Sequence, residues 1–434
     1  MRIEACFDSH VHWAATGEFA NRLRLDHLSR PSDILETKVQ AQHHRGEWLL
    51  GFGWDDNKWS ERPTRAVLDQ LFPSTPVALS RCDAHALWVN TEALKRAGLF
   101  SKQLPEIQGG RIELGRDGLP SGVLIDQARA PVERLIPRTD AFEMRRHLLR
   151  GVKTFNDSGF THIRDMTCNE TQWQEAVKLD ESGLLTLAVE EYFWLKNFAS
   201  FEEVLALTLR ARQSATGNLR VMGLKLFLDG ALGSEGAWLS RCYHGSENRG
   251  LILWDRTQLA NVLRKSWEQK LEVALHAIGD EAADWLLDLV LELKNEKVEG
   301  KFHIEHAELL RPETIAKMNG LAVECHLQPS HWLSDRKWLK NKIGPLAEFA
   351  FPWRRLQEAD VVFDFGSDAP IEPASLPRTF QALEDSAAAG IPRLLGGPTK
   401  YMGHRDHAWA PNSFTMLSDE NLPTQVVFKG EDLL

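Results

Sequence analysis

The chain has 434 residues, 43% hydrophobic and 26% charged, which is typical of a globular protein and excludes disordered and fibrous classes. Its net charge of −10 argues against a nucleic-acid or anionic-membrane surface, because such surfaces need clustered lysine and arginine, and it favours a small-molecule partner. The first residues hold no apolar run of signal-peptide length, and no later segment is long and apolar enough to span a membrane. We therefore expect a cytoplasmic protein, whose five cysteines, without a CxxC pair, fit reduced thiols.

Eight apolar segments rich in β-branched residues recur along the chain and predict strands. They lie at residues 5–10, 160–166, 185–193, 223–229, 271–277, 301–307, 321–327 and 361–368. Amphipathic segments of helical period separate most of them, at residues 141–159, 201–217, 257–270, 282–297 and 312–320. Strands that alternate with helices imply parallel βα units, and eight such units predict an α/β fold, a closed (β/α)8 TIM barrel. No GxGxxG or GxxxxGK[ST] element favours an open sheet instead.

A large insertion is expected after the first strand. A helix around residues 32–46 is followed by about a hundred residues before the helix that precedes the second strand. This insertion, at residues 48–138, has a strand signal at 76–81, a helix-like period at 83–98 and a glycine-rich hairpin signal at 108–122. Because it leaves the barrel at the end of the first strand, we expect it to roof the active site. The whole chain, residues 1–434, is then one barrel with one insertion.

Histidine, lysine and aspartate side chains stand at the ends of the predicted strands. His10 and His12 are two residues apart on the first strand, so both imidazoles project to the same side. Further candidates belong to the fourth, fifth, sixth and eighth strands: Lys225, His276, His306 and Asp368. The C-terminal ends of parallel strands meet at the mouth of a barrel, and buried polar groups without partners are costly. We therefore predict that these six side chains converge on a metal site.

The predicted ligands determine which metal and which reaction are expected. Imidazole and carboxylate suit Zn²⁺ and also admit Mn²⁺, Fe²⁺, Co²⁺ or Ni²⁺, so we expect zinc, as one or two ions. A neutral Lys225 can capture carbon dioxide and become N6-carboxylysine, which bridges two ions; otherwise it is a plain lysine paired with an acid such as Asp229, beside one ion. A bound ion lowers the pKa of water from about 15.7 to about 7, which makes hydroxide available. Asp368 would take the proton of the attacking water and pass it to the leaving nitrogen.

Six motifs resemble those of the amidohydrolase superfamily: FDSHVH, GLKLFLDGALGS, HAIGDEAAD, HIEHAELL, HLQPSHWLSD and FGSDAPIEP. Three more are similar to its YtcJ-like branch, which includes N-substituted formamide deformylases: SRCDAHALWVNTEAL, GGRIELGRDGLPSGVL and GFTHIRD. The likeness spans about residues 5–380 and implies a metal-dependent hydrolase on a (β/α)8 barrel, with its metal ligands at the six positions above. It also suggests pocket roles for six further residues: Asp83, His85, Trp88, Asn90, His326 and Gln328.

Two features depart from the family pattern. Members of this branch carry a longer segment ahead of the HxH triplet, which builds a small β-sandwich with a C-terminal stretch; here the triplet comes at once and the tail after Pro377 is short. We expect the sandwich to be reduced or missing. The tail also contains His404 and His407, which match no family motif and are expected at the surface. Glu305 is expected to support its neighbour His306 by accepting a hydrogen bond.

The leading hypothesis is a metal-dependent hydrolase that cleaves a C–N bond of amide or formamide type, other than a peptide bond, by means of a metal-activated hydroxide. One alternative is a non-catalytic, metal-containing barrel that binds a metabolite or partner. Another is an ester or phosphoester hydrolase, because the same ligands serve that chemistry. The sequence leaves open the substrate, the metal and its nuclearity, the state of Lys225 and whether the chain forms a homo-oligomer.

Overall fold

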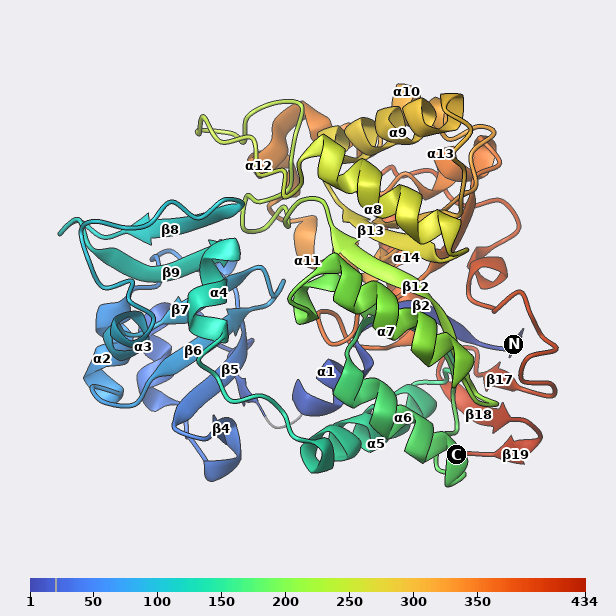
Figure 1. The fold of residues 1–434 in the computed structure, drawn as a ribbon, viewed down its shortest axis with the longest axis horizontal. Helices are drawn as coiled ribbons and strands as arrows, with labels where there is room; N and C mark the ends of the chain where they lie inside the picture. Colours follow the sequence, from blue (N-terminus) through green and yellow to red (C-terminus); the bar gives the residue numbers. More distant parts are fainter. Residues whose placement is uncertain (20–21) are drawn as a thin grey trace.

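Eight parallel strands form the central sheet of this computed structural model, which describes residues 1–19 and 22–434 (Figure 1). In sheet order they are β16 (Val362–Phe365), β15 (Val323–Leu327), β14 (Phe302–His306), β13 (Glu272–Ala277), β12 (Leu219–Phe227), β11 (Ala188–Trp194), β10 (His162–Cys168) and β2 (Phe7–Val11). After β16, the N–H of Asp368 donates to the carbonyl of His10 and the N–H of His12 donates to the carbonyl of Ala369, both at 2.8 Å. These bonds bring the last strand back to the first. The predicted (β/α)8 barrel is confirmed, and its strands overlap the eight predicted segments.

Helices cover the outside of the barrel. They are α1 (Trp13–Phe19), α5 (Ala141–Asp157), α6 (Glu170–Glu181), α7 (Phe201–Gln213), α8 (Arg256–Glu268), α9 (Asp280–Asn295), α10 (Pro312–Lys317), α11 (Pro329–Asp335), α12 (Leu339–Ile343), α13 (Trp353–Glu358) and α14 (Leu376–Ala388). Local sequence fixes where several begin: Asp140 accepts a hydrogen bond from the N–H of Glu143 at the start of α5. The buried residues of α5 then recur every three or four positions, which turns one apolar face toward the strands. Short 3₁₀ helices lie at Pro31–Glu36, Ala41–His43, Asp56–Lys58, Gln127–Arg129, Leu195–Asn197, Gly344–Phe349 and Pro398–Tyr401.

A glycine permits the close approach that closes the barrel. A Cβ atom at Gly366, directly after β16, would lie 2.6 Å from the backbone nitrogen of His10. Any other residue at this position would therefore push the eighth strand away from the first. The placement of Asp368, two residues later, depends on this contact between the strands.

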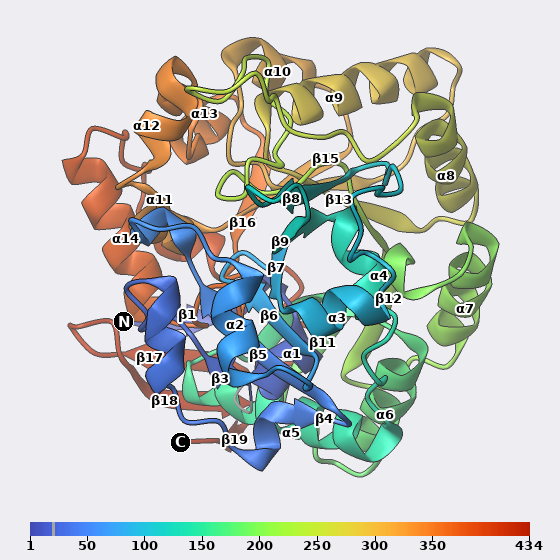
Figure 2. The ribbon, with the colours of Figure 1, turned by 90° about the vertical axis from the view of Figure 1, so that its left-hand side faces the viewer.

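The insertion folds as a second sheet with its own cores. Its strands are β3 (Leu23–Arg24), β4 (His44–Arg45), β5 (Trp48–Trp54), β6 (Val77–Arg81), β7 (Ala86–Val89), β8 (Gly110–Leu114) and β9 (Pro120–Asp126), joined by α2 (Arg65–Leu71), α3 (Thr91–Arg96) and α4 (Ala130–Glu133). Separate apolar clusters pack on its two faces. Figure 1 shows this sheet beside the barrel, and Figure 2, turned by 90°, shows it in front of the barrel.

Three local expectations for this region are wrong. The segment 32–46 contains short 3₁₀ helices and the strand β4 (His44–Arg45), and α1 (Trp13–Phe19) follows the first barrel strand instead. Strands β3 and β4 already belong to the second sheet, so this sheet starts before residue 48. The segment 83–98 is helical only in its second half, because Ala86–Val89 pairs with β6 and β9. The predicted strand at 76–81 and the predicted hairpin at 108–122 are both present.

A four-stranded antiparallel sheet joins the two ends of the described chain. Strand β1 (Arg2–Glu4) pairs with β17 (Phe414–Leu417), which continues to β18 (Pro423–Phe428) and β19 (Glu431–Asp432). Figure 1 shows both termini at this sheet. One small sheet at this position fits the expectation of a reduced β-sandwich. Within residues 1–19 and 22–434, no helix has the length and apolar character needed to cross a membrane.

Candidate metal centre and cavity

A cavity of about 810 Å³ lies between the mouth of the barrel and the insertion. The barrel contributes strand-end residues to its lining: His12, Lys225, His276, His306 and Asp368. The insertion contributes residues from the ends of its own strands: Phe52, Arg81, Asp83, His85 and Asp126. The volume suits a small organic molecule, and both parts of the fold would contact it.

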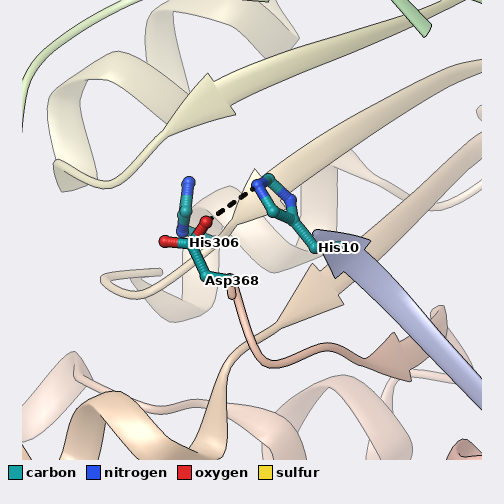
Figure 3. Close-up of side chains that lie close together, drawn as sticks. All are labelled: His10, His306 and Asp368. Atoms are coloured by element: carbon teal, nitrogen blue, oxygen red, sulfur yellow. Dashed lines mark ion pairs between the residues drawn. The ribbon is translucent and has the colours of Figure 1, made fainter. Parts of the chain in front are cut away.

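Three of the predicted ligands come together (Figure 3), and two of them, His306 and Asp368, line this cavity. His10 is the residue before the last of β2, His306 ends β14, and Asp368 follows β16. One ligand atom from each lies within 4.8 Å of the other two, and Nε2 of His10 is 3.4 Å from Oδ1 of Asp368. Ligand atoms bound to one ion at about 2.0–2.2 Å are separated by roughly 3–4 Å, so this triad is compact enough to share an ion.

The other three predicted ligands surround this triad. Nε2 of His12 is 2.9 Å from Oδ1 of Asp368, and the ring of His276 lies 4.5 Å from the ring of His306 between centroids. Lys225 is completely buried and faces the same cavity. The structure therefore gathers at one end of the barrel six side chains that are spread over most of the sequence.

Several atoms of this cluster are buried without a hydrogen-bond partner among the described residues. They are Nε2 of His10, Nδ1 of His12, Nζ of Lys225, Nδ1 of His276, Nδ1 of His306 and Oδ1 of Asp368. Each such atom costs about 1–3 kcal/mol when it stays unsatisfied. Imidazole nitrogen and carboxylate oxygen are the atom types that bind divalent ions, so the donor set fits a divalent metal.

The protonation states of the cluster also fit a metal. Burial, with the charges of neighbouring groups, lowers the pKa values of His276 and His306 well below their usual range, so both rings keep a free lone pair. Burial alone would raise the pKa of Asp368, but the neighbouring imidazoles of His10, His12 and His331 lower it well below its usual range. Burial lowers the pKa of Lys225 to about 8, so part of this amine is neutral near neutral pH.

Glu305 supports a different histidine from the one expected. Its Oε2 accepts a hydrogen bond of 2.5 Å from Nδ1 of His10, and its Oε1 accepts one of 2.7 Å from Arg164. The expectation that it supports His306 is wrong, because His10 and Arg164 engage its two carboxylate oxygens. Glu305 points into the barrel, where it fixes the ring of His10 with Nε2 toward Asp368.

On the insertion side, a histidine and an aspartate face the candidate metal centre. Nδ1 of His85 donates a hydrogen bond of 2.7 Å to Asp126, and the ring of His85 lies 5.1 Å from the ring of His276. Asp83, the other predicted pocket residue at the cavity, accepts a hydrogen bond of 2.6 Å from Arg81. Sequence reasoning missed Asp126, because only the pairing of β7 with β9 brings it next to His85.

Two predicted pocket residues of the insertion lie away from the cavity. Trp88 is completely buried in an apolar cluster, and its Nε1 donates to the carbonyl of Thr64 at 2.9 Å. Asn90 caps α3 by accepting a hydrogen bond of 3.0 Å from the N–H of Ala93. Neither lines the cavity. Both side chains serve the insertion's own packing, so the structure does not bring them to the cavity.

The two predicted pocket residues of the barrel are also outside the cavity lining. Nε2 of His326 is 3.0 Å from Nδ1 of His303, deeper in the barrel. Gln328 turns back, and its Nε2 donates to the carbonyl of His326 at 2.9 Å. Their side chains point into the barrel interior or onto the backbone, so the structure does not bring them to the cavity either.

One of the two tail histidines differs from its sequence interpretation. His404 is not a surface residue: it is 8% exposed, Nε2 lies 3.1 Å from Glu190, and its ring stacks on His162 at 5.2 Å, because the tail crosses the far end of the barrel. His407 is exposed, as expected.

His331, which sequence reasoning missed, lines the cavity with Nε2 3.5 Å from Oδ2 of Asp368. Burial opposes its protonation, but the neighbouring carboxylate of Asp368 raises its pKa to about 9.

Comparison with known proteins adds a family match. The model described as "Amidohydrolase family" matches residues 5–390. The chain is 28% identical to the protein LONG AFTER FAR-RED 3 of Arabidopsis thaliana, over 96% of this chain and 72% of that protein. It is 29% identical to the putative amidohydrolase YtcJ of Bacillus subtilis, over 84% of this chain and 70% of that protein. It is 23% identical to the N-substituted formamide deformylase of Arthrobacter pascens, over 84% of this chain and 70% of that protein.

Solved structures show the same fold. An uncharacterized metal-dependent hydrolase from Pyrococcus horikoshii superposes with a TM-score of 0.67 at 23% identity, covering 94% of this chain and 79% of that one. A second such protein, from Pyrococcus furiosus, gives a TM-score of 0.65 at 24% identity, covering 92% and 79%. At these identities the likeness concerns the arrangement of the barrel and its neighbouring sheets.

Proposed function

The chain belongs to the amidohydrolase family, in its YtcJ-like branch, and from this premise we propose that it hydrolyses a C–N bond of amide or formamide type in a small molecule. The proposal excludes peptide bonds as the natural target. The observation that carries it is the convergence of His10, His306 and Asp368, with unpartnered ligand atoms, beside a cavity. The names of two relatives, a putative amidohydrolase and an N-substituted formamide deformylase, support the choice of bond.

A divalent metal fits the donor atoms of this site. His10, His12, His306 and Asp368 would hold one ion, and Lys225 with His276 would complete the site for a second. When bound, such an ion supplies a Lewis acid and lowers the pKa of a water molecule toward about 7. We propose zinc, since imidazole and carboxylate suit it, although manganese and iron accept the same ligands.

Lys225 is proposed to be carboxylated in the active protein. Burial lowers the pKa of its amine to about 8, and the neutral amine is the form that reacts with carbon dioxide to give a carbamate. Nζ has no hydrogen-bond partner among the described residues. A carbamate would replace an unsatisfied buried amine by an anion, the charge that two neighbouring ions require.

Asp368 is proposed to move the proton. It is ionised, and Oδ1 faces His10 and His12 while Oδ2 lies 3.5 Å from His331. Such a carboxylate can take the proton of the attacking water and deliver it to the leaving nitrogen. His331, with a raised pKa, would keep the carboxylate oriented during this transfer. His85, held by Asp126, would contact the substrate from the insertion side.

A substrate panel tests the proposed reaction. Protein reconstituted with Zn²⁺ or Mn²⁺ would be offered N-substituted formamides, N-acyl amino acids, lactams, carboxylic esters and phosphoesters. We expect turnover of a formamide or amide, and we expect it to disappear on chelation. Turnover of esters or phosphoesters alone would contradict the proposed bond type. Binding without turnover across the whole panel would favour a non-catalytic barrel.

A further inference from the structure

One wall of the cavity carries two carboxylates without ionic partners. Glu308 follows β14, and Asp335 is the last residue of α11; both line the cavity. Neither carboxylate takes part in an ion pair or a side-chain hydrogen bond within the described part of the chain. The candidate metal centre does not use them, so their presence at this wall needs another reason.

Glu308 is the more buried of the two. It is 5% exposed, and its Oε1 is buried without a hydrogen-bond partner among residues 1–19 and 22–434. A buried, unpaired carboxylate is costly, and its side chain faces the cavity, not the apolar core. A positively charged group in the cavity would supply the missing partner.

Asp335 belongs to a helical face that points at the same space. His331, Ser334 and Asp335 are spaced by three and four residues, so they lie on one side of α11. Trp338 follows three residues later and lines the cavity as well. Both acids line the same cavity. Burial, and after it the charge of Glu308, raises the pKa of Asp335.

Neighbouring acids of this wall are already neutralised by cations of the chain. Glu372 pairs with Arg378 at 2.6 Å, and Asp55 pairs with Arg81 at 2.9 Å. These arginines are consequently engaged. His331 lies on the same wall. Burial raises the pKa values of Glu308 and Asp335, and the charge of His331 opposes this rise, but Nε2 of His331 is directed to Asp368 and His331 forms no ion pair with either acid among the described residues.

We propose that Glu308 and Asp335 form a subsite for a cationic group of the substrate, a primary ammonium or a guanidinium. An alkylammonium stays protonated at neutral pH, because its pKa is about 10.4 in lysine, and it would donate charge-assisted hydrogen bonds to both carboxylates. Trp338 also lines this wall, and Nζ of Lys342 lies 5.3 Å from the centroid of its ring. This inference rests on the proposed function of the same cavity, and it narrows the substrate to amides that carry a basic group.

The geometry also indicates where that basic group lies relative to the scissile bond. Glu308 is two residues from His306, and the ring of His331 stacks on that of His306 with centroids 6.0 Å apart. The acidic pair is thus next to the candidate metal centre. A short alkyl chain between the amide and the ammonium group would span the two.

Binding measurements test the subsite without requiring turnover. Isothermal calorimetry at pH 7 would compare n-pentylammonium chloride with 1-pentanol on the metal-loaded wild type, on Glu308→Gln and on Asp335→Asn. We expect the wild type to bind the ammonium at least about tenfold more tightly than the alcohol, and each variant to lose about tenfold of that preference. Glu313→Gln removes one negative charge from an exposed side chain outside the cavity and should change nothing. Equal binding of both probes by the wild type, or an unchanged preference in both variants, would overturn the subsite.

Kinetics with matched substrates separates the subsite from the proposed reaction. N-(4-aminobutyl)formamide and N-pentylformamide differ by an ammonium in place of a methyl group. We expect kcat/KM to be higher for the first compound, and the ratio of the two kcat/KM values to fall about tenfold in Glu308→Gln.

If neither compound is hydrolysed but ammonium binding still depends on Glu308, the cation subsite stands and the proposed hydrolysis of formamides fails. If both are hydrolysed equally by wild type and variant, the hydrolase stands and the subsite fails. Circular dichroism of both variants checks that they fold.

Discussion

The two ends of the barrel interior differ in how their polar side chains are paired. At the mouth, Lys225 and His306 make no side-chain hydrogen bond within the described residues. His303 lies three residues before His306 on the same strand, and both of its ring nitrogens make polar contacts. Nδ1 of His303 lies 3.0 Å from His326, and Nε2 lies 2.7 Å from Glu272. Other side chains of the interior are paired as well: Arg164 bonds Glu305 at 2.7 Å, and the hydroxyl of Tyr192 donates to Glu272 at 2.7 Å. His326, whose Nδ1 lacks a partner among the described residues, keeps the contact of its Nε2 with His303.

This difference shows what each end of the interior is for. In the deeper region, burial of polar groups is offset by their pairing, so those side chains contribute to the stability of the fold. At the mouth, the same cost is left uncompensated and would be offset only when a ligand binds. Substitutions at the two ends should therefore have opposite consequences for activity and for stability.

Closeness of ligand atoms does not distinguish the two ends. His303, Glu324 and His326 also offer ligand atoms within 4.8 Å of one another. However, the two histidines contact each other, and Glu324 pairs with Lys301 at 3.2 Å. A metal there would have to break existing contacts, so we expect ions to bind at the mouth instead.

The largest expected effect is on catalysis. Asp368→Asn keeps the shape of the side chain but removes the base that moves the proton, and we expect kcat/KM to fall by about 10²–10⁴. Asp364→Asn makes the same change on β16, where Asp364 pairs with Arg405 at 2.7 Å, and should keep most of the activity. Comparable losses in the two variants, measured with the same substrate, would contradict the assignment of function to the mouth.

The next effect is on stability, at the deeper end. Arg164→Met would leave Glu305 completely buried without the arginine that bonds it at 2.7 Å. Breaking such a buried pair costs about 3–5 kcal/mol in unfolding free energy. Arg220→Met, which breaks a partly exposed pair with Asp406, should cost no more than about 1 kcal/mol. Chemical denaturation measures both, and equal costs would show that pairing inside the barrel does not stabilise the fold.

Lys225 should show the reverse behaviour in metal-free protein. Burial lowers the pKa of Lys225 to about 8, whereas a lysine in the unfolded chain titrates near 10.4. Between these values the unfolded chain binds more protons than the folded one, so the unfolding free energy of the wild type rises with pH. A difference of about 2.4 pKa units corresponds to about 3 kcal/mol.

Denaturation at pH 7.5 and 10.5 checks this linkage. Lys225→Met should be the more stable protein at pH 7.5, and the wild type should recover most of the difference at pH 10.5. Activity should be lost in the variant at both values. Parallel pH profiles of the two proteins would mean that this amine is not the buried, unpaired group that the structure shows.

The sequence allows the barrel and its mouth to be predicted because both follow from local periodicity. The segment 271–277, for instance, has the pattern of a buried strand and becomes β13 at Glu272–Ala277. His276 lies near the C-terminal end of this strand, and the C-terminal ends of the parallel strands meet at the mouth of a barrel. The residues around His276 are therefore enough to place it at the mouth.

What could not be predicted depends on contacts between distant residues. Glu305 binds His10, 295 positions earlier in the chain, and not its neighbour. Trp88 is packed away from the cavity by strand pairing within the insertion, and His404 is buried because the tail returns to the barrel. Hydrophobic pattern specifies which strands form, but it does not specify which partner each side chain meets.

Elemental analysis of two histidine variants tests the central claim most directly. After reconstitution with Zn²⁺, we expect at least about one ion per chain in the wild type and in His303→Ala, since His303 belongs to the deeper, paired region. His306→Ala removes a ligand itself. Loss of a residue that only hydrogen-bonds a ligand lowers metal affinity by up to roughly 100-fold, so we expect His306→Ala to lower the affinity for Zn²⁺ by more than this. A wild type with less than about one ion per chain, or a metal content that falls in His303→Ala and not in His306→Ala, would contradict the account.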